Sequence, residues 1–175
     1  DGTQVWVIAM VAREPLILMG NERVDNPFVA AFEKPIFMQL APDGRFLALA
    51  RTSETPAPTF REWQLALTTL ELTVDATASG PWSMTQTDST GTYESGYNWT
   101  ADGALKRVRQ RYISTMSPAA DVPLVAQILA SSTKAETHPQ GAWFKRIESR
   151  EHIRVSTEAG VLFADADTQI NLDSI

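Results

Sequence analysis

The chain has 175 residues, contains no cysteine, and carries 15 Lys and Arg against 21 Asp and Glu, for a formal net charge of -6. The missing thiols exclude disulfides, cysteine-ligated metal sites and a cysteine nucleophile. The acidic balance argues against a general nucleic-acid binder, which needs a basic footprint. Hydrophobic residues make up 43% and charged residues 21%, as in ordinary globular proteins. We therefore expect one domain over residues 1–175, and the absence of an initiator Met favours a processed chain or a module of a larger protein.

Charge is distributed unevenly along the chain. Residues 101–155 carry 9 basic and 5 acidic groups, whereas residues 156–175 carry no basic group and 4 acidic ones. An anionic partner, if there is one, is expected to bind the basic section 101–155. The apolar stretch from Val5 to Ala12 is much shorter than the roughly 20 residues of a spanning helix, so we expect no transmembrane segment.

The first half of the chain predicts strands followed by one helix. Residues 4–11 and 16–19 are apolar and rich in β-branched side chains, which favours strands. Residues 35–40 and 45–49 flank Pro42-Asp43-Gly44, and proline followed by Asp-Gly is typical of a hairpin turn. Residues 60–72 carry apolar side chains at helical spacing, and Thr59 with Glu62 matches a capping box. This amphipathic helix must bury its apolar stripe against a sheet or inside a barrel.

The second half predicts a series of short strands. They cover residues 82–88, 92–99 and 105–113, and then 143–147, 153–156 and 161–164, with turns between them. Asp121-Val122-Pro123 has the cap and the first-turn proline of a second, short helix over residues 122–130. The whole pattern predicts a mainly β fold, an antiparallel barrel of about ten to eleven strands around the central helix 60–72.

Chemistry that would define an enzyme is not found in the sequence. His138 and His152 have no further ligands at zinc-site spacing. The glycines are scattered singly, so no phosphate-binding loop is present, and no Gly-x-Ser-x-Gly elbow occurs. We therefore expect no enzymatic activity and no cofactor.

Two sets of side chains allow a functional and a structural interpretation. On the strand at 105–113, Arg107, Arg109 and Arg111 alternate with Lys106, Val108, Gln110 and Tyr112. The three arginines are candidate contacts for an anionic lipid or protein, or they form a solvent-exposed face that protects a strand edge. The tryptophans line a ligand cavity or fill the core; they are Trp6, Trp63, Trp82, Trp99 and Trp143.

Residues 30–97 resemble the N-terminal barrel of the large lipid transfer proteins, the vitellogenin and microsomal triglyceride transfer protein family. The order of hairpin, helix ending in Leu70-Glu71-Leu72, and later strand is similar. Asp88, Gly91 and Tyr97 match the family's Asp-x-x-Gly-x-Cys-x-x-x-Tyr pattern, with Tyr93 in place of the cysteine. The chain is identified as a divergent, bacterial member by this resemblance.

The resemblance implies a role in lipid transport. It implies a barrel of about eleven strands around a helix, an extracytoplasmic location, and contacts with lipid or with partner proteins. Two alternatives remain open: a structural or surface-assembly domain that presents loops to protein partners, and a lipocalin-type barrel with a small ligand in its lumen. Nucleic acid is not an expected partner.

Overall fold

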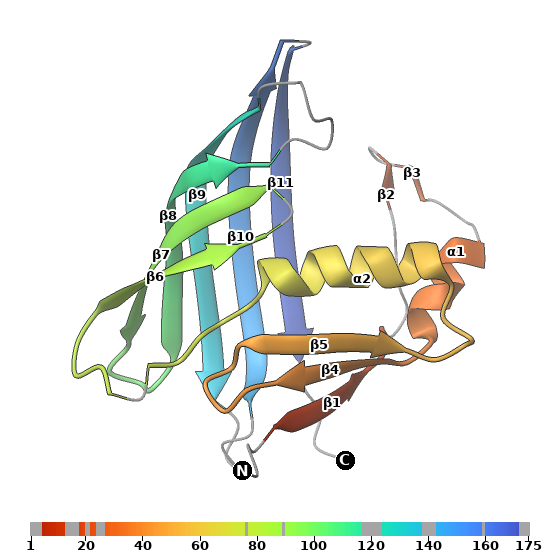
Figure 1. The fold of residues 1–175 in the computed structure, drawn as a ribbon, viewed down its shortest axis with the longest axis horizontal. Helices are drawn as coiled ribbons and strands as arrows, with labels where there is room; N and C mark the ends of the chain where they lie inside the picture. Colours follow the sequence, from red (N-terminus) through yellow and green to blue (C-terminus); the bar gives the residue numbers. More distant parts are fainter. Residues whose placement is uncertain are drawn as a thin grey trace. The chain divides into compact units, whose positions relative to one another are not determined.

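The computed structural model describes residues 5–12, 18–19, 22–23, 27–75, 77–88, 90–116, 124–137, 143–158 and 160–171. These residues form a mainly β structure with a few helical segments (Figure 1). The chain divides into two compact units, residues 1–74 and 75–175, and each is described by itself. The expectation of a single domain stays a prediction.

The first unit contains two small antiparallel sheets and the helices. Its three-stranded sheet has the order β1-β4-β5, and β2 pairs with β3. Ile36, Met38 and Leu40 of β4 are fully buried and alternate with exposed residues, which is the period of a strand with one face on a core. The elements are β1 (Trp6–Met10), β2 (Leu18–Met19), β3 (Glu22–Arg23), α1 (Pro27–Ala30), the 3-10 helix η1 (Ala31–Glu33), β4 (Ile36–Leu40), β5 (Phe46–Arg51) and α2 (Ala57–Thr69).

The turn at residues 42–44 joins β4 to β5, as the sequence predicts. The Ala41 N–H donates to the Arg45 carbonyl oxygen at 2.9 Å, and the Gly44 N–H donates to the Ala41 carbonyl oxygen at 2.9 Å. Gly44 has a φ of 88°, and a Cβ at this position would clash with the carbonyl oxygen of Leu72. Both the backbone conformation and the close approach therefore require glycine.

Helix α2 begins and ends three residues before the predicted range 60–72. Its N-cap is Pro56, which makes no side-chain capping hydrogen bond, so the predicted capping box at Thr59 is wrong. The earlier start has a physical reason, because a proline such as Pro58 is preorganised for the first turn of a helix. Leu67 is buried as the apolar stripe predicts.

The second unit is a six-stranded antiparallel sheet in which each strand pairs with its neighbour in sequence, in the order β11-β10-β9-β8-β7-β6. Within the described residues no pairing joins β6 to β11, so the sheet has two edges. The mainly β, antiparallel architecture is confirmed, and closure into a barrel around α2 stays a prediction. The strands are β6 (Trp82–Thr87), β7 (Gly91–Trp99), β8 (Leu105–Thr115), β9 (Val125–Thr137), β10 (Phe144–Thr157) and β11 (Gly160–Asn171).

The predicted helix over 122–130 is wrong for the residues that the structure describes. Residues 125–130 belong to β9, where Val125 pairs with Ser156 and Ile128 with Ile153 of β10. Backbone pairing with a neighbouring strand outweighs the weak local preference for helix. Residues 121–123, which carry the predicted cap and proline, lie outside the described residues.

The predicted strands 143–147 and 153–156 are parts of one long strand, β10. Ile147, Ser149 and Glu151 are buried, and the residues between them are exposed. The alternation shows that the strand continues through residues 148–152, the charged segment between the two predicted strands. No helix among the described residues is long and apolar enough to cross a membrane.

Candidate functional site

Asp88 and Gly91 bracket the turn between β6 and β7. The Asp88 N–H donates to the Gly91 carbonyl oxygen at 2.9 Å. The Asp88 Oδ1 accepts the N–H groups of Thr90 and Gly91 at 2.8 and 3.0 Å, so the carboxylate stabilises its own turn. A Cβ on Gly91 would lie 2.8 Å from the Cα of Thr115, because β8 passes close to the turn. Tyr97, the third residue of the matched pattern, is 2% exposed, and its hydroxyl donates to Gln86 Oε1 at 2.6 Å.

Strand β8 contains two register shifts opposite β7, and they decide which way its side chains point. Ser95 pairs with Arg109 but Glu94 pairs with Arg111, so Gln110 is an extra residue. Such a bulge exchanges the faces of the residues that follow it. Tyr112 therefore shares a face with Arg109, and the predicted alternation is wrong from Arg111 onward.

The three arginines of the predicted ladder have different environments. Arg107 and Arg109 are 0% and 2% exposed, although both were expected at the surface. The Arg111 side chain is 74% exposed and pairs with Glu94 at 3.0 Å. An anionic partner would therefore meet Arg111 alone of the three.

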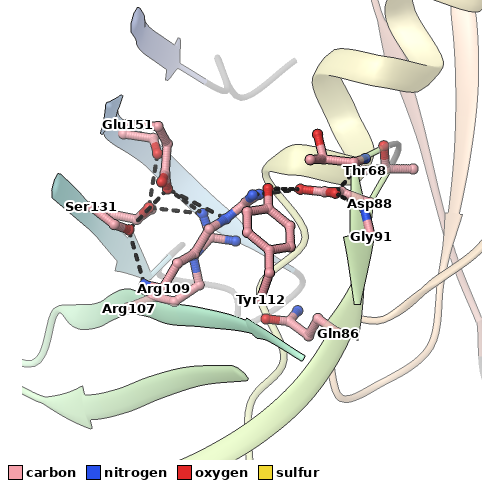
Figure 2. Close-up of polar contacts among 12 residues, drawn as sticks. Thr68, Gln86, Asp88, Gly91, Arg107, Arg109, Tyr112, Ser131 and Glu151 are labelled. Atoms are coloured by element: carbon pink, nitrogen blue, oxygen red, sulfur yellow. Dashed lines mark hydrogen bonds and ion pairs between the residues drawn. The ribbon is translucent and has the colours of Figure 1, made fainter. Parts of the chain in front are cut away.

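Arg107 and Arg109 form a buried charge cluster with Asp88 and Glu151 (Figure 2). The Arg109 Nη1 lies 2.5 Å from Asp88 Oδ2, and its Nε lies 3.5 Å from Glu151 Oε1. The Arg107 Nη2 lies 3.3 Å from the same Glu151 oxygen. Two positive and two negative side chains thus neutralise one another where water is excluded, which is the condition for tolerating buried charges.

The hydroxyl groups of Ser131 and Thr133 from β9 complete the cluster at the point where β8 and β9 separate. The β8–β9 ladder has three residue pairs and ends at Arg107 and Thr133. Beyond it, the Arg109 N–H donates to Ser131 Oγ at 2.9 Å, and this hydroxyl donates to Glu151 Oε1 at 3.1 Å. Side chains thus replace the missing backbone partners, as buried polar groups require.

One tyrosine ring lies against the Arg109 guanidinium, and a second tyrosine contacts that ring and Asp88. Its Cζ lies 4.1 Å from the centre of the Tyr93 ring, a favourable cation–π distance. Tyr112 contacts Tyr93 edge-on at 5.9 Å between ring centres, and its hydroxyl donates to Asp88 Oδ2 at 3.3 Å. Burial raises the pKa of Tyr93 to about 12. Burial also acts to lower the pKa of Arg109, but Tyr93, Glu151 and Asp88 outweigh this effect and raise it, so Arg109 stays charged.

Glu151 is the acidic group that burial affects most clearly. Desolvation raises the pKa of Glu151 above its ordinary value of 4.5, and Arg109 and Arg107 offset part of this rise. Its Oε1 accepts the hydrogen bonds described above, whereas its Oε2 is buried without a hydrogen-bond partner among the described residues. The unpartnered oxygen is consistent with a carboxyl that takes up a proton more readily than in water.

The raised pKa of Glu151 predicts a pH dependence of stability. The folded protein binds this proton more tightly than the unfolded chain, so the free energy of unfolding should fall as pH rises through the window above 4.5. Glu151→Gln should remove this component of the pH profile. Urea unfolding of both proteins across the window measures it, and parallel profiles would contradict the assignment.

The basic section 101–155 has little unpaired positive charge. Seven of its nine Lys and Arg side chains form ion pairs with carboxylates of the same unit, and one of these carboxylates comes from the acidic strand β11. The expected free basic surface is therefore largely neutralised. The pairs are Arg107 and Arg109 in the cluster, Arg111 with Glu94, Lys134 with Asp102, Lys145 with Glu136, Arg146 with Glu148 and Arg150 with Asp167.

Large apolar side chains are exposed at the end of the sheet where β8 and β10 end and β9 and β11 begin. The Thr115 hydroxyl donates to the Leu124 carbonyl oxygen, which holds the end of β8 beside the start of β9. The exposed fractions of the six large apolar side chains at this end run from 47% to 66%, and exposed apolar side chains are usually scattered singly over a surface. We call this set the apolar end; its residues are Ile113, Met116, Val125, Val161, Leu162 and Phe163.

A cavity of about 400 Å³ lies along β6, β7 and β8. Gly96 and Gln110 both line it, and a Cβ on Gly96 would approach Gln110 Nε2 to 2.7 Å. Of the five tryptophans, Trp82 alone lines it, so the cavity is not the tryptophan-lined lumen of the lipocalin-type alternative. Its lining residues are Pro81, Trp82, Ser83, Gly96, Tyr97, Asn98, Val108 and Gln110.

No protein-family model, no curated protein and no solved structure matches this chain. Within the described residues, no group of three or more His, Asp or Glu side chains is placed to hold a metal ion. Sequence reasoning identified Asp88, Arg107 and Arg109 but missed Glu151 as their partner. The sequence does hold a sign of this role. Glu151 lies an even number of residues after Ile147, so in a continuous strand both side chains lie on the same, buried face.

Proposed function

We propose that this chain is a non-enzymatic interaction domain of the lipid-transfer type, acting outside the cytoplasm, that contacts lipid through the apolar end of its six-stranded sheet. The observation that carries the proposal is the exposure of the apolar end, where Leu162 and Val125 are 66% and 65% exposed. Large exposed apolar side chains gathered at one end of a sheet are typical of a contact with lipid or protein. The resemblance of residues 30–97 to the large lipid transfer proteins supports lipid as the first choice. The barrel around a central helix and the place within a larger protein belong to the same proposal.

The charge pattern supports a contact that depends on apolar burial. Most basic side chains of 101–155 pair within the unit, so few remain to attract anionic headgroups. Attraction of a protein to anionic lipid needs unpaired Lys or Arg near the membrane surface. We therefore expect binding to neutral and anionic vesicles to be similar and to respond weakly to salt.

Vesicle flotation of the full chain tests the proposal. Phosphatidylcholine vesicles, with and without phosphatidylglycerol, should carry the protein upward in a density gradient. Ile113→Asp combined with Val125→Asp should abolish flotation, because both side chains are exposed at the apolar end. Val7→Asp is the matched control, since Val7 is a strand valine with 63% exposure in the other unit. Absence of flotation, or equal loss in the control, would overturn the lipid role.

One observation favours the alternative of a structural or surface-assembly domain. Strand β11 is an edge of the six-stranded sheet, and no strand among the described residues pairs with its outer side. Unpaired edges are sites at which another strand can add through backbone hydrogen bonds.

A further inference from the structure

The β11 edge is long and regular. All twelve residues of Gly160–Asn171 pair with β10 without a register shift, from Thr157↔Gly160 to Arg146↔Asn171. The β9–β10 and β7–β8 ladders, in contrast, contain shifts. A strand without bulges presents its free N–H and C=O groups at the even spacing that a further strand requires.

The start of this edge lacks the devices by which proteins protect such strands. Natural edges carry charged side chains, proline or bulges, or are very short, and on β11 the charges begin only at Asp165. Strand β11 has no Pro, Lys or Arg. Its two acidic residues, Asp165 and Asp167, already pair with His152 and Arg150 of β10, and residues 161–163 carry no charge at all.

Apolar side chains are exposed on both faces of this edge. Leu162 pairs with Val155 on the face of the charge cluster and is 66% exposed. Val161 and Phe163 point to the opposite face and are 51% and 55% exposed. A partner docking flat against the sheet would cover one face only. An added strand covers both, because its side chains become neighbours on both faces.

We infer that the first five residues of β11, 160–164, are the docking edge for a second copy of this chain, which adds antiparallel with Leu162 opposite Leu162 of the other copy. This register sets Val161 opposite Phe163 of the second copy, and Phe163 opposite its Val161. All three exposed apolar side chains thus meet apolar partners. Residues that lie opposite each other in this register are both odd-numbered or both even-numbered. Each side chain therefore meets a side chain on the same face of the continued sheet.

Charge selects this register over a full-length overlap. Pairing the whole of β11 with itself would centre on residues 165–166 and place Asp165 opposite Asp165 or Asp167 of the second copy. Like charges directly opposite are destabilising. Centring on Leu162 moves both aspartates beyond residues 160–164, where the apolar pairs lie, and this removes the repulsion.

Symmetry explains why the partner is a second copy. Two identical antiparallel edges pair about a two-fold axis and close, so that the assembly stops at a dimer. A different protein would need its own edge with the same apolar pattern. The proposed dimer supplies the partner for the assembly role above and rests on that role. It covers Val161, Leu162 and Phe163 of the apolar end, so a second copy and lipid compete for these three side chains.

Sedimentation velocity of the full chain in lipid-free buffer, over a series of concentrations, tests the inference. We expect a reversible monomer–dimer equilibrium. Leu162→Lys places two like charges at the axis and should weaken association by roughly tenfold or more. The matched control is Gln169→Lys, an exposed β11 position outside the apolar overlap, which should leave association unchanged.

A charge exchange tests the register itself. Val161→Lys with Phe163→Lys, and separately Val161→Glu with Phe163→Glu, should each be monomeric because like charges oppose one another. Their mixture should associate, since every Lys then faces a Glu. Both positions are exposed, so each variant should fold, and circular dichroism checks this.

Three outcomes would overturn the inference. They are a wild-type chain that remains monomeric, a dimer that Leu162→Lys leaves intact, and variants that fail to associate when mixed. A monomeric chain that still floats with vesicles would remove the dimer and leave the lipid role standing. Flotation is measured below the dissociation constant of the dimer, where the apolar end is uncovered. A chain that does not float there but dimerises at higher concentration would remove the lipid role and support the second copy.

Discussion

Arg109→Ala is expected to lower the free energy of unfolding by about 3–5 kcal/mol, because removing one partner of a buried ion pair leaves uncompensated charge. Arg109 is 2% exposed and lies between Asp88 and Glu151, with the Tyr93 ring against its guanidinium. Its loss removes the ion pair of Asp88 and leaves Glu151 paired with Arg107. Urea unfolding followed by tryptophan fluorescence measures the change.

Arg111→Ala is the matched control, since it removes the same side chain two residues along the same strand. The Arg111 side chain is 74% exposed, and exposed pairs contribute about 0–1 kcal/mol. The Arg109 loss should also shrink at mildly acidic pH, where Glu151 takes up a proton. A loss of about 1 kcal/mol or less in Arg109→Ala, equal to that of the control, would contradict the role of the buried pairs.

Local patterns in the sequence predict much of this fold because they report local physics. The turn at 42–44 was predictable, since proline and glycine restrict or extend the backbone where they stand. The turn between Asp88 and Gly91 was predictable for the same reason. Helix α2 was predicted three residues too late because the capping signal at Thr59 competed with the prolines before it.

Long-range pairing explains what the sequence did not reveal. The extra residue Gln110 in β8 depends on the register against β7, so regular alternation wrongly placed Arg111 with Arg109. The basic section 101–155 looks free in sequence, but folding places it beside distant carboxylates such as Asp167. The helix predicted at 122–130 is strand for the same reason, because β9 pairs with β10.

Asp88→Ala is expected to cost about 3–5 kcal/mol, comparable to Arg109→Ala, because this carboxylate serves the turn and the charge cluster together. Its Oδ1 accepts the N–H groups of Thr90 and Gly91, and its Oδ2 pairs with Arg109. Asp88→Asn keeps an oxygen for the turn but removes the charge. The Asn variant should therefore lose less than the Ala variant.

A double-mutant cycle separates the two roles of Asp88. If the pair with Arg109 dominates, Asp88→Ala combined with Arg109→Ala should cost much less than the sum of the single changes, since neither charge is then left alone. If the turn dominates, Asp88→Asn should be close to wild type. Additive losses, together with a full loss in the Asn variant, would contradict both roles. Because Tyr112 also donates to Asp88 Oδ2, Tyr112→Phe is the control for the remaining hydrogen bond, and it should cost about 1 kcal/mol.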